Sequence, residues 1–584
     1  MTSEKIVEVA KRRGFFLQSF GAYSGVSGFY TYGPTGAPLK RNVEDVWRDR
    51  FVVREGNQEI DAPTVMPEPV FEASGHLDTF DDMLIACSEC EESHRADHLI
   101  EDETDLADAE SLPTEEIEDL IADNGIGCPN CGADLAGVAV DDFNLMFGTN
   151  IGPGSASPGY LRPETVQGIF VEFPQLKEYA RNQLPFGVAQ IGRAYRNEIS
   201  PRRSIIRTRE FTQAELDLFI DPEEDRPDLS DLADVRLPLY SAPDQQADDG
   251  DLEEMTLAEA VEEGPVDSEW VGYYLGIAKE WYERVGVDMD RFRFRQHLAG
   301  ERAHYASDCW DAEAEIDGDW IELAGFSYRS DYDLRKHGEH SGEDFTIFRE
   351  YDEPKSVTRA TVDPDMSTLG PEYGSAAADI AAELAALAER DPDAFEGEDV
   401  TVEVDGESYE VPVDVANFRI EERTESGEHI TPHVVEPSFG VDRLVYTILH
   451  HGYREDEIDG EKRVYLELDP EVAPTTVAVF PLMDREGMGE YATELEADLR
   501  SVGFATAYDD SGAIGRRYRR QDEVGTPFCV TVDHRTLEDD TVTVRERDST
   551  EQRRIPVDEL TDALEELRDT DRSFEDFSSY ELVE

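Results

Sequence analysis

Lysine is scarce in this chain. Only eight of the 584 residues are lysine, so arginine carries almost all of the positive charge. Asp and Glu number 134 against 53 Lys and Arg, which gives a formal net charge of −81. Such carboxylates repel one another in dilute buffer, but near 1 M salt the Debye length falls to about 3 Å and screens them. We therefore expect a halophilic protein from a very salty cytoplasm; an acidic mesophile protein is the alternative.

Long apolar runs are also absent. No segment approaches the roughly 20 apolar residues of a membrane-spanning helix, and the N-terminus lacks the apolar core of a signal peptide. This predicts a soluble cytoplasmic protein that does not enter membranes. Cysteine numbers only six, and four of these form two CxxC pairs. That pattern suits metal binding in a reducing compartment better than disulfide formation.

The length of the chain predicts two to four domains. After the Tyr-Gly-Pro turn at residues 32–34, apolar residues recur on one face of an expected helix. They are Leu39, Val43, Val46, Trp47 and Phe51. From about residue 473, buried strand patterns alternate with helical ones, which favours a separate small α/β domain.

An arginine-rich hairpin stands out against the acidic background. Residues 193–209 read RAYRNEISPRRSIIRTR, with six arginines and the single acid Glu198. The flanking segments suit antiparallel strands, and period two places Ala194 and Arg196 on one face, opposite Phe211. A small residue, a guanidinium and an aromatic ring leave a slot where a purine stacks while arginine holds a phosphate. A solvated basic hairpin is the alternative.

These residues resemble the second signature motif of class II aminoacyl-tRNA synthetases, in the form found in glycyl-tRNA synthetases of the archaeal and eukaryotic type. Residues 32–51 resemble motif one, and residues 436–444 (EPSFGVDRL) resemble motif three. The strings FEASGH, HRADHLIE, YLRPETVQGIF and RSDYDLRKH are also similar to this family. The resemblance spans nearly the whole chain. It implies an α+β fold, with an antiparallel-sheet catalytic domain and a C-terminal α/β anticodon-binding domain, and a homodimer formed through motif one.

The resemblance also implies a division of the chain. The catalytic core, with motifs one and two, would occupy residues 1–80 and 141–220, and a zinc-binding insertion would lie between them at 81–140. Further core with an acidic insertion would follow at 221–354, then a peripheral insertion at 355–425 and core with motif three at 426–470. The anticodon-binding domain would occupy residues 471–584. One position departs from part of the family: Asp442 precedes Arg443 where some members have glycine. That departure leaves the local hydrogen bonding open.

The activity implied by the resemblance is ATP-dependent activation of glycine, followed by transfer to tRNA(Gly). Arg196 would hold the α-phosphate of ATP, and Arg207 and Arg443 would clamp the other two phosphates, with Mg²⁺ as a further counter-charge. Phe211 would stack on adenine. Glu322 would hold ATP through a metal ion, although a buried ion-pair partner is the alternative. The full ATP-binding set is Arg196, Asn197, Glu198, Ile206, Arg207, Phe211, Glu322, Leu323, Gly440 and Arg443, with Arg196, Glu198 and Arg443 as the catalytic candidates.

Glycine offers only an ammonium and a carboxylate, so selectivity must come from holding the ammonium and leaving no volume for a methyl group. Glu164, Glu215 and Glu436 resemble the ammonium-binding set of the family. Clustered acids raise one another's pKa unless a cation joins them, and the ammonium of the substrate is that cation. The full glycine-binding set is Arg95, Glu164, Phe211, Glu215, Arg329, Glu436, Ser438 and Gly440, in which Arg95 and Arg329 would bind the glycine carboxylate or order the acids.

The two CxxC pairs have the spacing of metal knuckles, which predicts one tetrahedral, structural Zn²⁺ site. The ligands would be Cys87, Cys90, Cys128 and Cys131. His94 or His98 is an alternative ligand, although their place in HRADHLIE favours packing near the substrate. Four reduced thiols without metal is the remaining alternative. Cys309 and Cys529 lie in apolar contexts and are interpreted as core residues.

A second group of arginines lies near the C-terminus. Residues 516–520 carry four arginines on about one and a half helical turns, and residues 545–554 carry four more. Local basicity in an acidic chain indicates a polyanion site, and the pattern resembles the anticodon-binding domain of glycyl, prolyl, threonyl and histidyl synthetases. The tRNA-binding candidates are Arg516, Arg517, Arg519 and Arg520. A helix face with internal salt bridges is the alternative.

Other functions remain open at this point. A prolyl or threonyl synthetase shares the class II motifs, and a non-catalytic paralogue would bind RNA only. The joint presence of Arg196, Phe211 and Arg443 argues against that paralogue, because a pure binding module has no use for an ATP slot. An acidic zinc scaffold would leave both arginine groups unexplained.

Overall fold

The computed structural model describes residues 2–104, 106, 109, 112–154, 157–201, 204–247, 250–298, 307–404, 406–458, 460–570 and 572–583. Arg202 and Arg203, at the tip of the predicted basic hairpin, lie outside the described residues. The chain forms two compact units, one comprising Met1–Phe345 with Pro432–Glu584 and the other Thr346–Thr431. No helix among the described residues is long and apolar enough to cross a membrane.

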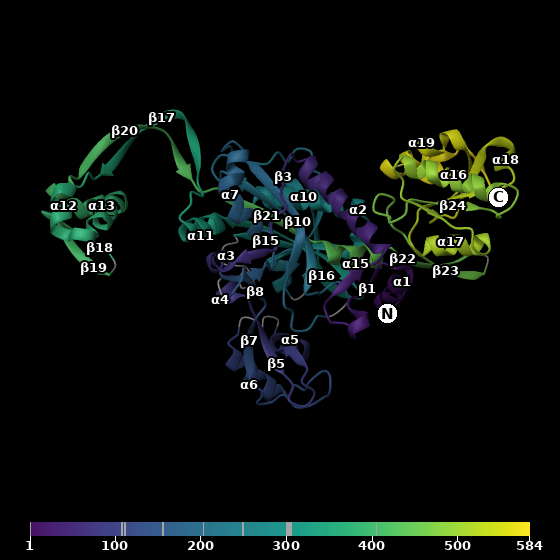
Figure 1. Ribbon diagram of the computed structural model, residues 1–584, viewed down its shortest axis with the longest axis horizontal. Coiled ribbons are helices and arrows are strands. Elements are labelled where there is room, and N and C mark those ends of the chain that lie inside the picture. The colour runs from purple at the N-terminus through teal and green to yellow at the C-terminus, as the bar shows by residue number, and fades with distance from the viewer. Residues whose placement is uncertain are drawn as a thin grey trace. The chain divides into compact units, whose positions relative to one another are not determined.

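A nine-stranded sheet forms the centre of the larger unit, in the order β13-β12-β14-β15-β16-β21-β11-β10-β3 (Figure 1). Its pairs are antiparallel except β10 with β3 and β12 with β14. The strands are β3 (Gln58–Glu59), β10 (Phe186–Tyr195), β11 (Glu210–Ile220), β12 (Arg236–Tyr240), β13 (Glu253–Thr256), β14 (Phe292–Gln296), β15 (Asp308–Ile316), β16 (Asp319–Ser330) and β21 (His433–Gly440). This confirms the predicted antiparallel α+β core.

Three helices pack their apolar residues against this sheet: α2 (Gly36–Arg48), α10 (Glu269–Arg284) and α15 (Val441–His451). Helix α2 buries the predicted stripe, because Leu39, Val43, Val46 and Trp47 recur on one helical face and Phe51 follows it. The Phe51 ring lies 4.9 Å from that of Phe439 in β21. Each such buried side chain contributes about 1.5–3 kcal/mol. The apolar faces of these helices therefore pack against one face of the sheet, and the site lies on its other face.

Smaller elements complete the larger unit. The predicted zinc-binding insertion forms its own sheet, β6-β5-β7, with two helices and a separate apolar core. Its elements are β5 (Asp81–Ala86), β6 (Ser93–Arg95), α5 (Ala96–Glu103), α6 (Thr114–Asn124) and β7 (Val140–Asn144). Other elements near the site are β4 (Val65–Pro67), α3 (Glu68–Ala73), α4 (His76–Thr79), β8 (Phe147–Ile151), β9 (Ser157–Leu161), α7 (Gln167–Tyr179) and α11 (Tyr332–Ser341).

The C-terminal part contains a six-stranded sheet in the order β25-β24-β26-β27-β28-β29, with its own buried core. The strands are β24 (Val477–Pro481), β25 (Thr506–Tyr508), β26 (Phe528–Val532), β27 (Thr541–Glu546), β28 (Gln552–Pro556) and β29 (Glu581–Leu582). The helices are α16 (Met488–Ser501), α17 (Ile514–Asp522) and α19 (Val557–Asp569). The predicted change to strands alternating with helices is confirmed here.

The smaller unit is a long antiparallel ribbon that carries a small globular end (Figure 1). The ribbon consists of β17 (Ile347–Thr361) and β20 (Arg419–Ile430), and the globular end of α12 (Met366–Tyr373), α13 (Ala377–Arg390), β18 (Asp399–Val404) and β19 (Glu407–Pro412). The sequence placed a peripheral insertion at 355–425. The compact unit begins nine residues earlier and ends six later, because both ribbon strands belong to it.

Candidate active site

A cavity of about 610 Å³ opens on the face of the central sheet formed by β11, β16 and β21. Its lining includes all of the predicted ATP-binding residues except Asn197. They are Arg196, Glu198, Ile206, Arg207, Phe211, Glu322, Leu323, Gly440 and Arg443. Asn197 instead donates its backbone N–H to the carbonyl of Leu145 at 2.8 Å. Residues of motif two, of β16 and of motif three, up to 247 positions apart in the chain, thus meet around one hollow.

The hairpin that carries motif two is antiparallel, with Ala194 opposite Phe211. Strand β10 ends at Tyr195, so the period-two argument does not extend to Arg196 and Glu198, which lie in the following loop. The loop nevertheless turns both side chains into the cavity. Its backbone is held by the Arg196 N–H, which donates to the carbonyl of Arg209 at 3.1 Å. The residues were correctly placed at the cavity, although their expected strand geometry was wrong.

Arg196 lies between two aromatic rings. Its guanidinium carbon is 5.5 Å from the centre of the Phe211 ring and 5.4 Å from that of Phe80. Its Nε donates to the carbonyl of Pro163 at 3.2 Å. These contacts hold a positive charge beside an exposed aromatic face, the combination that suits a phosphate and a purine. Phe80, which follows helix α4, was not singled out from the sequence.

Two ion pairs line the cavity. Nη1 of Arg443 donates to the carboxylate of Glu322 at 3.0 Å and to its backbone carbonyl at 2.9 Å. The Arg443 guanidinium holds the pKa of Glu322 below its usual range, against the opposing effect of burial. Arg207 donates through Nε to Glu198 at 2.6 Å. The Glu322 side chain is 51% exposed, so it is an ion-pair partner in the cavity wall but not the buried one that the alternative interpretation stated.

Asp442 joins the three motifs. Its carboxylate accepts a hydrogen bond from the Tyr32 hydroxyl of motif one and another from the backbone N–H of Thr212 in motif two, each at 2.5 Å. Asp442 is 5% exposed, and burial followed by the nearby carboxylate raises the pKa of Tyr32 well above its usual value. The departure noticed in the sequence thus supplies the local hydrogen bonding that was left open.

A group of buried acids adjoins the cavity, and Ser438 contacts both. Ser438 lines the cavity and donates its hydroxyl to Glu215 at 2.7 Å. The Thr165 hydroxyl donates to the other oxygen of Glu215. Glu215 and Ser438 face each other across β11 and β21. Burial, then the charge of Glu164, raises the pKa of Glu215, while the two hydroxyls oppose that rise.

The second predicted acid, Glu436, is held by an arginine. Nη1 of Arg329 donates to Glu436 at 2.6 Å, while Nε and Nη2 grip Asp333 at 2.8 and 3.0 Å. Burial raises the pKa of Glu436 and Arg329 lowers it, while the charges of Glu215 and Glu164 also raise it, with a net result of about 8. Arg329 therefore orders the acids, one of the two roles predicted for it. Asp333 was not singled out, although it stands four residues after Arg329 on α11.

The third acid, Glu164, lies between β9 and α7. His76 Nε2 is 3.3 Å from its carboxylate, and the Gln167 side chain donates to the same oxygen at 2.9 Å. Burial would raise the pKa of Glu164, but His76, Arg329 and Gln167 together hold it well below its usual range. Each of the three acids therefore has a different set of partners, and only Glu215 is held solely by neutral donors.

Asp217 is a fourth acid at this place, and the sequence reasoning missed it. It follows Glu215 on the same face of β11 and is fully buried. Neither carboxylate oxygen has a hydrogen-bond partner among the described residues. Burial, then the charges of Glu436 and Glu215, raises its pKa well above the usual value. The period of two along β11 was the signal that would have found it.

Arg95 lies apart from these acids. It pairs with Asp82 at 3.0 Å and with Asp97, on the insertion side of the site. It lines a second cavity that shares Arg207 and Arg443 with the first. Burial raises the pKa of Asp82 to about 6, and Arg95 opposes that rise. Its role in glycine binding stays a prediction; the partners that the structure gives it are Asp82 and Asp97, and it faces the second cavity.

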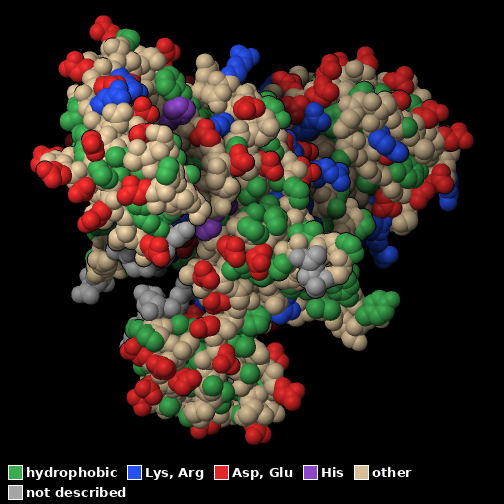
Figure 2. Space-filling model, turned by 60° about the vertical axis from the view of Figure 1, so that its left-hand side comes forward, with side chains coloured by type: hydrophobic (Ala, Val, Ile, Leu, Met, Phe, Trp, Pro, Cys, Tyr) green, Lys and Arg blue, Asp and Glu red, His purple; other side chains and the backbone are tan. Residues whose placement is uncertain are grey.

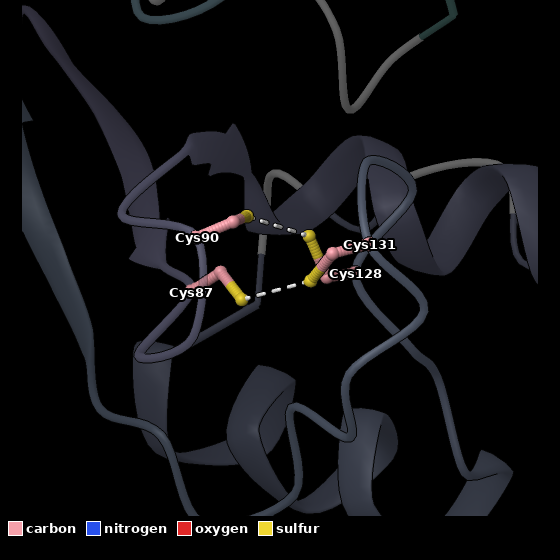
Figure 3. Close-up of side chains that lie close together, drawn as sticks. All are labelled: Cys87, Cys90, Cys128 and Cys131. Carbon is pink, nitrogen blue, oxygen red and sulfur yellow. Dashed lines mark hydrogen bonds between the residues drawn. The ribbon is translucent and has the colours of Figure 1, made fainter.

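The two CxxC pairs come together in the insertion (Figure 3). The ligand atoms of Cys87, Cys90, Cys128 and Cys131 all lie within 4.8 Å of one another. The Sγ atoms of Cys87 and Cys131 are 3.6 Å apart, and those of Cys90 and Cys128 are 3.7 Å apart. His94 Nε2 lies 3.3 Å from the sulfur of Cys128. Four thiols converging on one point can hold a metal ion, with His94 as an outer contact.

The C-terminal arginines divide into buried and accessible ones. Arg545, Arg547, Arg553 and Arg554 are 2–7% exposed and satisfy internal partners, such as Asp522 for Arg545 at 2.8 Å. Arg517 is also buried and donates to the carbonyls of Asp510 and Gly512. These five arginines stabilise the domain, as in the alternative of internal salt bridges, and of the tRNA-binding candidates Arg517 is the buried one. Arg516 is exposed, and Arg519 and Arg520 are partly so.

Comparison with known proteins agrees with this geometry. A family model described as the tRNA synthetase class II core domain (G, H, P, S and T) matches residues 157–242, and an anticodon binding domain model matches residues 476–567. The glycine–tRNA ligase of Methanothrix thermoacetophila is 49% identical over 566 residues, covering 97% of this chain and 96% of the relative. The chain belongs to the glycine–tRNA ligase family. A second family member, from Methanothermobacter thermautotrophicus, is 48% identical over 567 residues, covering 97% and 99%.

A solved structure supports the fold of this family member. Prolyl-tRNA synthetase from Cryptosporidium parvum, in complex with halofuginone and AMPPNP, aligns with a TM-score of 0.51 and 15% identity, covering 97% of this chain and 77% of that one. At that identity the likeness concerns the fold alone. The class II catalytic core followed by an anticodon-binding domain is therefore confirmed for this glycine–tRNA ligase family chain.

Proposed function

We propose that this chain activates glycine with ATP and esterifies it to the 3′ end of tRNA(Gly). Full-length family relatives support the reaction class. The observation that carries the proposal is the position of Ser438, whose hydroxyl lies in the wall of the arginine-lined cavity and bonds the buried Glu215. The ATP site and the site for the ammonium group of glycine would therefore both be bounded by Ser438.

In the first step, a carboxylate oxygen of glycine attacks the α-phosphorus of ATP and pyrophosphate leaves. Arg196 would hold the α-phosphate, and Arg207 and Arg443 the leaving phosphates, because guanidinium groups stabilise charge that spreads over phosphate oxygens. Phe211 would stack on adenine. When bound through Glu322, Mg²⁺ supplies further charge neutralisation. The role of the chain is mainly to position the reactants and offset their charge.

Recognition of glycine would rest on the group of buried acids. Glu164, Glu215 and Glu436 lie close enough to raise one another's pKa, and the ammonium of glycine would supply the counter-charge that they lack. One extra methyl in an adaptable pocket changes binding by only about 1–3 kcal/mol, so a rigid wall is required. The hydroxyls of Thr165 and Ser438 and the Arg329 clamp hold two of these acids in fixed positions. That rigidity supports selection of the smallest amino acid.

In the second step, the ribose hydroxyl of the terminal adenosine of tRNA attacks the glycyl carbonyl, and AMP leaves. The C-terminal domain would bind the anticodon arm through its accessible arginines, Arg516, Arg519 and Arg520. In high salt, phosphate contacts lose affinity steeply. Base stacking and shape therefore gain importance in this domain relative to bulk charge.

We propose Zn²⁺ for the four-cysteine site. A tetrahedron with Zn–S bonds of about 2.3 Å has edges of about 3.8 Å. The sulfur separations of 3.6 and 3.7 Å fit that size. Four protein ligands leave no open position, so the ion would stabilise the insertion. Its one chemical contribution is to keep the four thiolates together.

We also propose a homodimer through the motif-one region, in the cytoplasm. Several apolar side chains of the N-terminal part are exposed, including Tyr23 at 85%, Val53 at 68% and Phe20 at 53%. These side chains flank the motif-one segment in the sequence, and exposed apolar residues that form one patch favour burial against a partner. Sedimentation in molar KCl tests this: a monomer at micromolar concentration would contradict the proposed dimer.

The decisive test is ATP–pyrophosphate exchange with each of the twenty amino acids in molar KCl. We expect exchange with glycine, and Glu215→Ala should lower it by orders of magnitude. Glu280→Ala, an exposed acid on α10, is the matched control. Exchange driven by proline or threonine would support the other class II activities. Tight tRNA binding without exchange for any amino acid would support the non-catalytic paralogue.

A further inference from the structure

Arg162 is a charged side chain that the catalytic core encloses almost completely. It directly follows β9, is 1% exposed and is not part of the cavity lining. An enclosed positive charge is costly unless hydrogen bonds and an opposite charge compensate it. The neighbours of Arg162 therefore indicate why this charge is kept inside the core.

Every hydrogen bond of the Arg162 guanidinium to the described residues ends on a neutral oxygen atom. Its Nε donates to the carbonyl of Arg193 at 2.9 Å, and its Nη1 donates to the carbonyls of Ala62 and Pro63 at 3.1 and 3.5 Å. The Gln190 side chain, oriented with its amide oxygen toward the guanidinium, accepts from Nη2 at 2.8 Å. Among the described residues no carboxylate forms an ion pair with Arg162. Its opposite charge must therefore act from a greater distance.

The Arg162 guanidinium lies on the sheet face that carries Glu215. Gln190 pairs with Glu215 across β10 and β11, so their side chains leave the same face. Gly192 continues that face of β10, and a Cβ there would collide with Nη2 of Arg162. The guanidinium thus occupies the place of the missing side chain at residue 192, diagonally across from Glu215. Glycine is required at this position because only glycine permits that close approach.

The segment that carries Arg162 also supplies partners of Glu215. The Thr165 hydroxyl and the Val166 N–H, three and four residues further on, both donate to the Glu215 carboxylate. Ser438 is the third donor. Among the described residues, Glu215 is thus bonded only by neutral donors, just as Arg162 is bonded only by neutral acceptors. The two charges belong to one network without a direct ion pair.

The two buried charges stabilise each other through space. Burial lowers the pKa of Arg162, and the charge of Glu215 is the largest effect that opposes this fall. A Coulomb interaction is mutual, so Arg162 in turn favours the ionised form of Glu215. Burial and the charge of Glu164 raise the pKa of Glu215. Asp217 and Glu436 are further acids around it. A nearby cation is therefore needed to oppose its protonation.

We propose that Arg162 is a positioning residue for glycine: its buried guanidinium keeps Glu215 ionised, so that this carboxylate can receive the ammonium group. The inference rests on the proposed function, and it adds a residue that controls glycine recognition without touching the substrate. Glu436 differs, because Arg329 bonds its carboxylate directly. The guanidinium of Arg162 instead bonds carbonyl oxygens, which leaves the Glu215 charge available to the substrate.

The first test separates glycine binding from ATP binding. KM for glycine and KM for ATP are each measured in ATP–pyrophosphate exchange with the unchanged protein, Arg162→Gln and Arg162→Lys. An opposite charge nearby moves a carboxyl pKa by about 1 to 3, and each step of 1 changes the ionised fraction by up to about tenfold. Arg162→Gln should therefore raise KM for glycine at least about tenfold, with KM for ATP almost unchanged. Arg162→Lys keeps the charge and should recover most of the glycine affinity.

Arg463 provides the matched control. It is a second fully buried arginine, and it bonds the carbonyl of Arg547 at 2.6 Å and Asp456 at 2.9 Å. Arg463→Gln should lower stability and leave KM for glycine unchanged. Equal rises of both KM values in Arg162→Gln, or no recovery in Arg162→Lys, would assign Arg162 to packing of the motif-two hairpin. Either result would overturn the proposal.

The second test needs no substrate. Urea unfolding in molar KCl is measured for the unchanged protein, Arg162→Gln, Glu215→Gln and the double variant. If the two charges compensate each other, Arg162→Gln should lower the urea midpoint less in the Glu215→Gln background than alone. Additive changes would overturn the proposal. Failure of the proposed function has a different signature, because the unchanged protein would then show no glycine-dependent exchange, whereas this cycle would still report the charge interaction.

Discussion

The guanidinium of Arg196 lies 5.5 Å from the centre of the Phe211 ring, on the side of the sheet where the cavity opens. Phe211 lies on β11, whereas Arg196 directly follows β10, in the loop of the same hairpin that also carries the phosphate-side arginine, Arg207. A positive charge and an aromatic face are thus held at a fixed separation before any substrate binds. A charge that is already in position stabilises the transition state more than a charge that must first move into place.

Removal of the Arg196 charge should impair activation directly. We expect Arg196→Ala to lower glycine-dependent ATP–pyrophosphate exchange by about 10²–10³-fold, the usual effect of losing one preorganised donor to a developing charge. Arg390→Ala, on an exposed part of α13, is the control. An Arg196→Ala protein that retains more than a tenth of the activity would exclude Arg196 from the phosphate site.

The hydrogen bonds accepted by Asp442 should contribute measurably to the free energy of unfolding. Asp442→Ala leaves the buried Tyr32 hydroxyl and the Thr212 N–H without an acceptor, at about 1–3 kcal/mol for each group. A double-mutant cycle with Tyr32→Phe isolates their interaction, which we expect to be about 0.5–3 kcal/mol. Urea unfolding in molar KCl gives the free energies. Additive effects of the two changes would show that the hydrogen bond contributes nothing.

Local patterns in the sequence were sufficient for much of the site. The family resemblance put Ser438 and Glu215 in one glycine-binding set, and the structure pairs them across β11 and β21. The apolar stripe of α2 was predicted from its helical spacing. In each case the decisive interaction lies within one element or between adjacent elements, so residue spacing carries the information.

Other features depend on contacts between distant segments, which spacing cannot reveal. Arg95 sits beside the phosphate-side residues because the insertion folds against the motif-two loop. Arg517 looks in sequence like its accessible neighbours, yet its guanidinium is enclosed by carbonyls of preceding loops. Asp333 acts through Arg329, and its importance appears only once Glu436 lies on the other side of that arginine. These relationships are properties of tertiary packing.

Glycine binding should strengthen as the pH rises from 6 to 8. The pKa of Glu436 is raised to about 8, so in the empty pocket this carboxyl is mostly protonated below that pH. The glycine ammonium favours the ionised form, and binding must therefore release a proton. We expect the Kd to fall by up to about tenfold per pH unit and to level off above pH 8, before free glycine loses its own proton.

Calorimetry at pH 6, 7 and 8, in two buffers of different ionisation enthalpy, measures both the Kd and the released proton. Glu436→Gln should bind glycine more weakly and with less pH dependence. A Kd that is constant over this range, with no proton release, would show that Glu436 is already ionised in the empty pocket. The Arg329 contact would then dominate over burial.

Metal content should follow the four cysteines. We expect one zinc ion per chain in freshly purified protein, and near-complete loss of metal in Cys128→Ser. Cys529→Ser is the control, because Cys529 is buried in the C-terminal sheet away from the cluster. Elemental analysis decides the matter. Absence of metal from the unchanged protein would leave four reduced thiols.

Stability should rise with salt. Carboxylates are distributed over the visible face of the molecule without a compensating number of cations (Figure 2). Screening of their repulsion is nearly complete near 1 M salt. We expect the urea midpoint to increase between 0.1 and 2 M KCl and then to level off. Equal midpoints at both ends of that range would identify an acidic protein without halophilic adaptation.

The enclosed guanidinium groups of the C-terminal sheet have a further consequence. Arg545 and Arg554 each carry their own counter-ion, Asp522 and Asp533, inside the fold. Dissolved ions reach such pairs poorly, whereas they reach the outer carboxylates freely. Lowering the salt concentration should therefore destabilise the acidic surface before the interior. The C-terminal sheet should be among the last regions to exchange its amide hydrogens with the solvent.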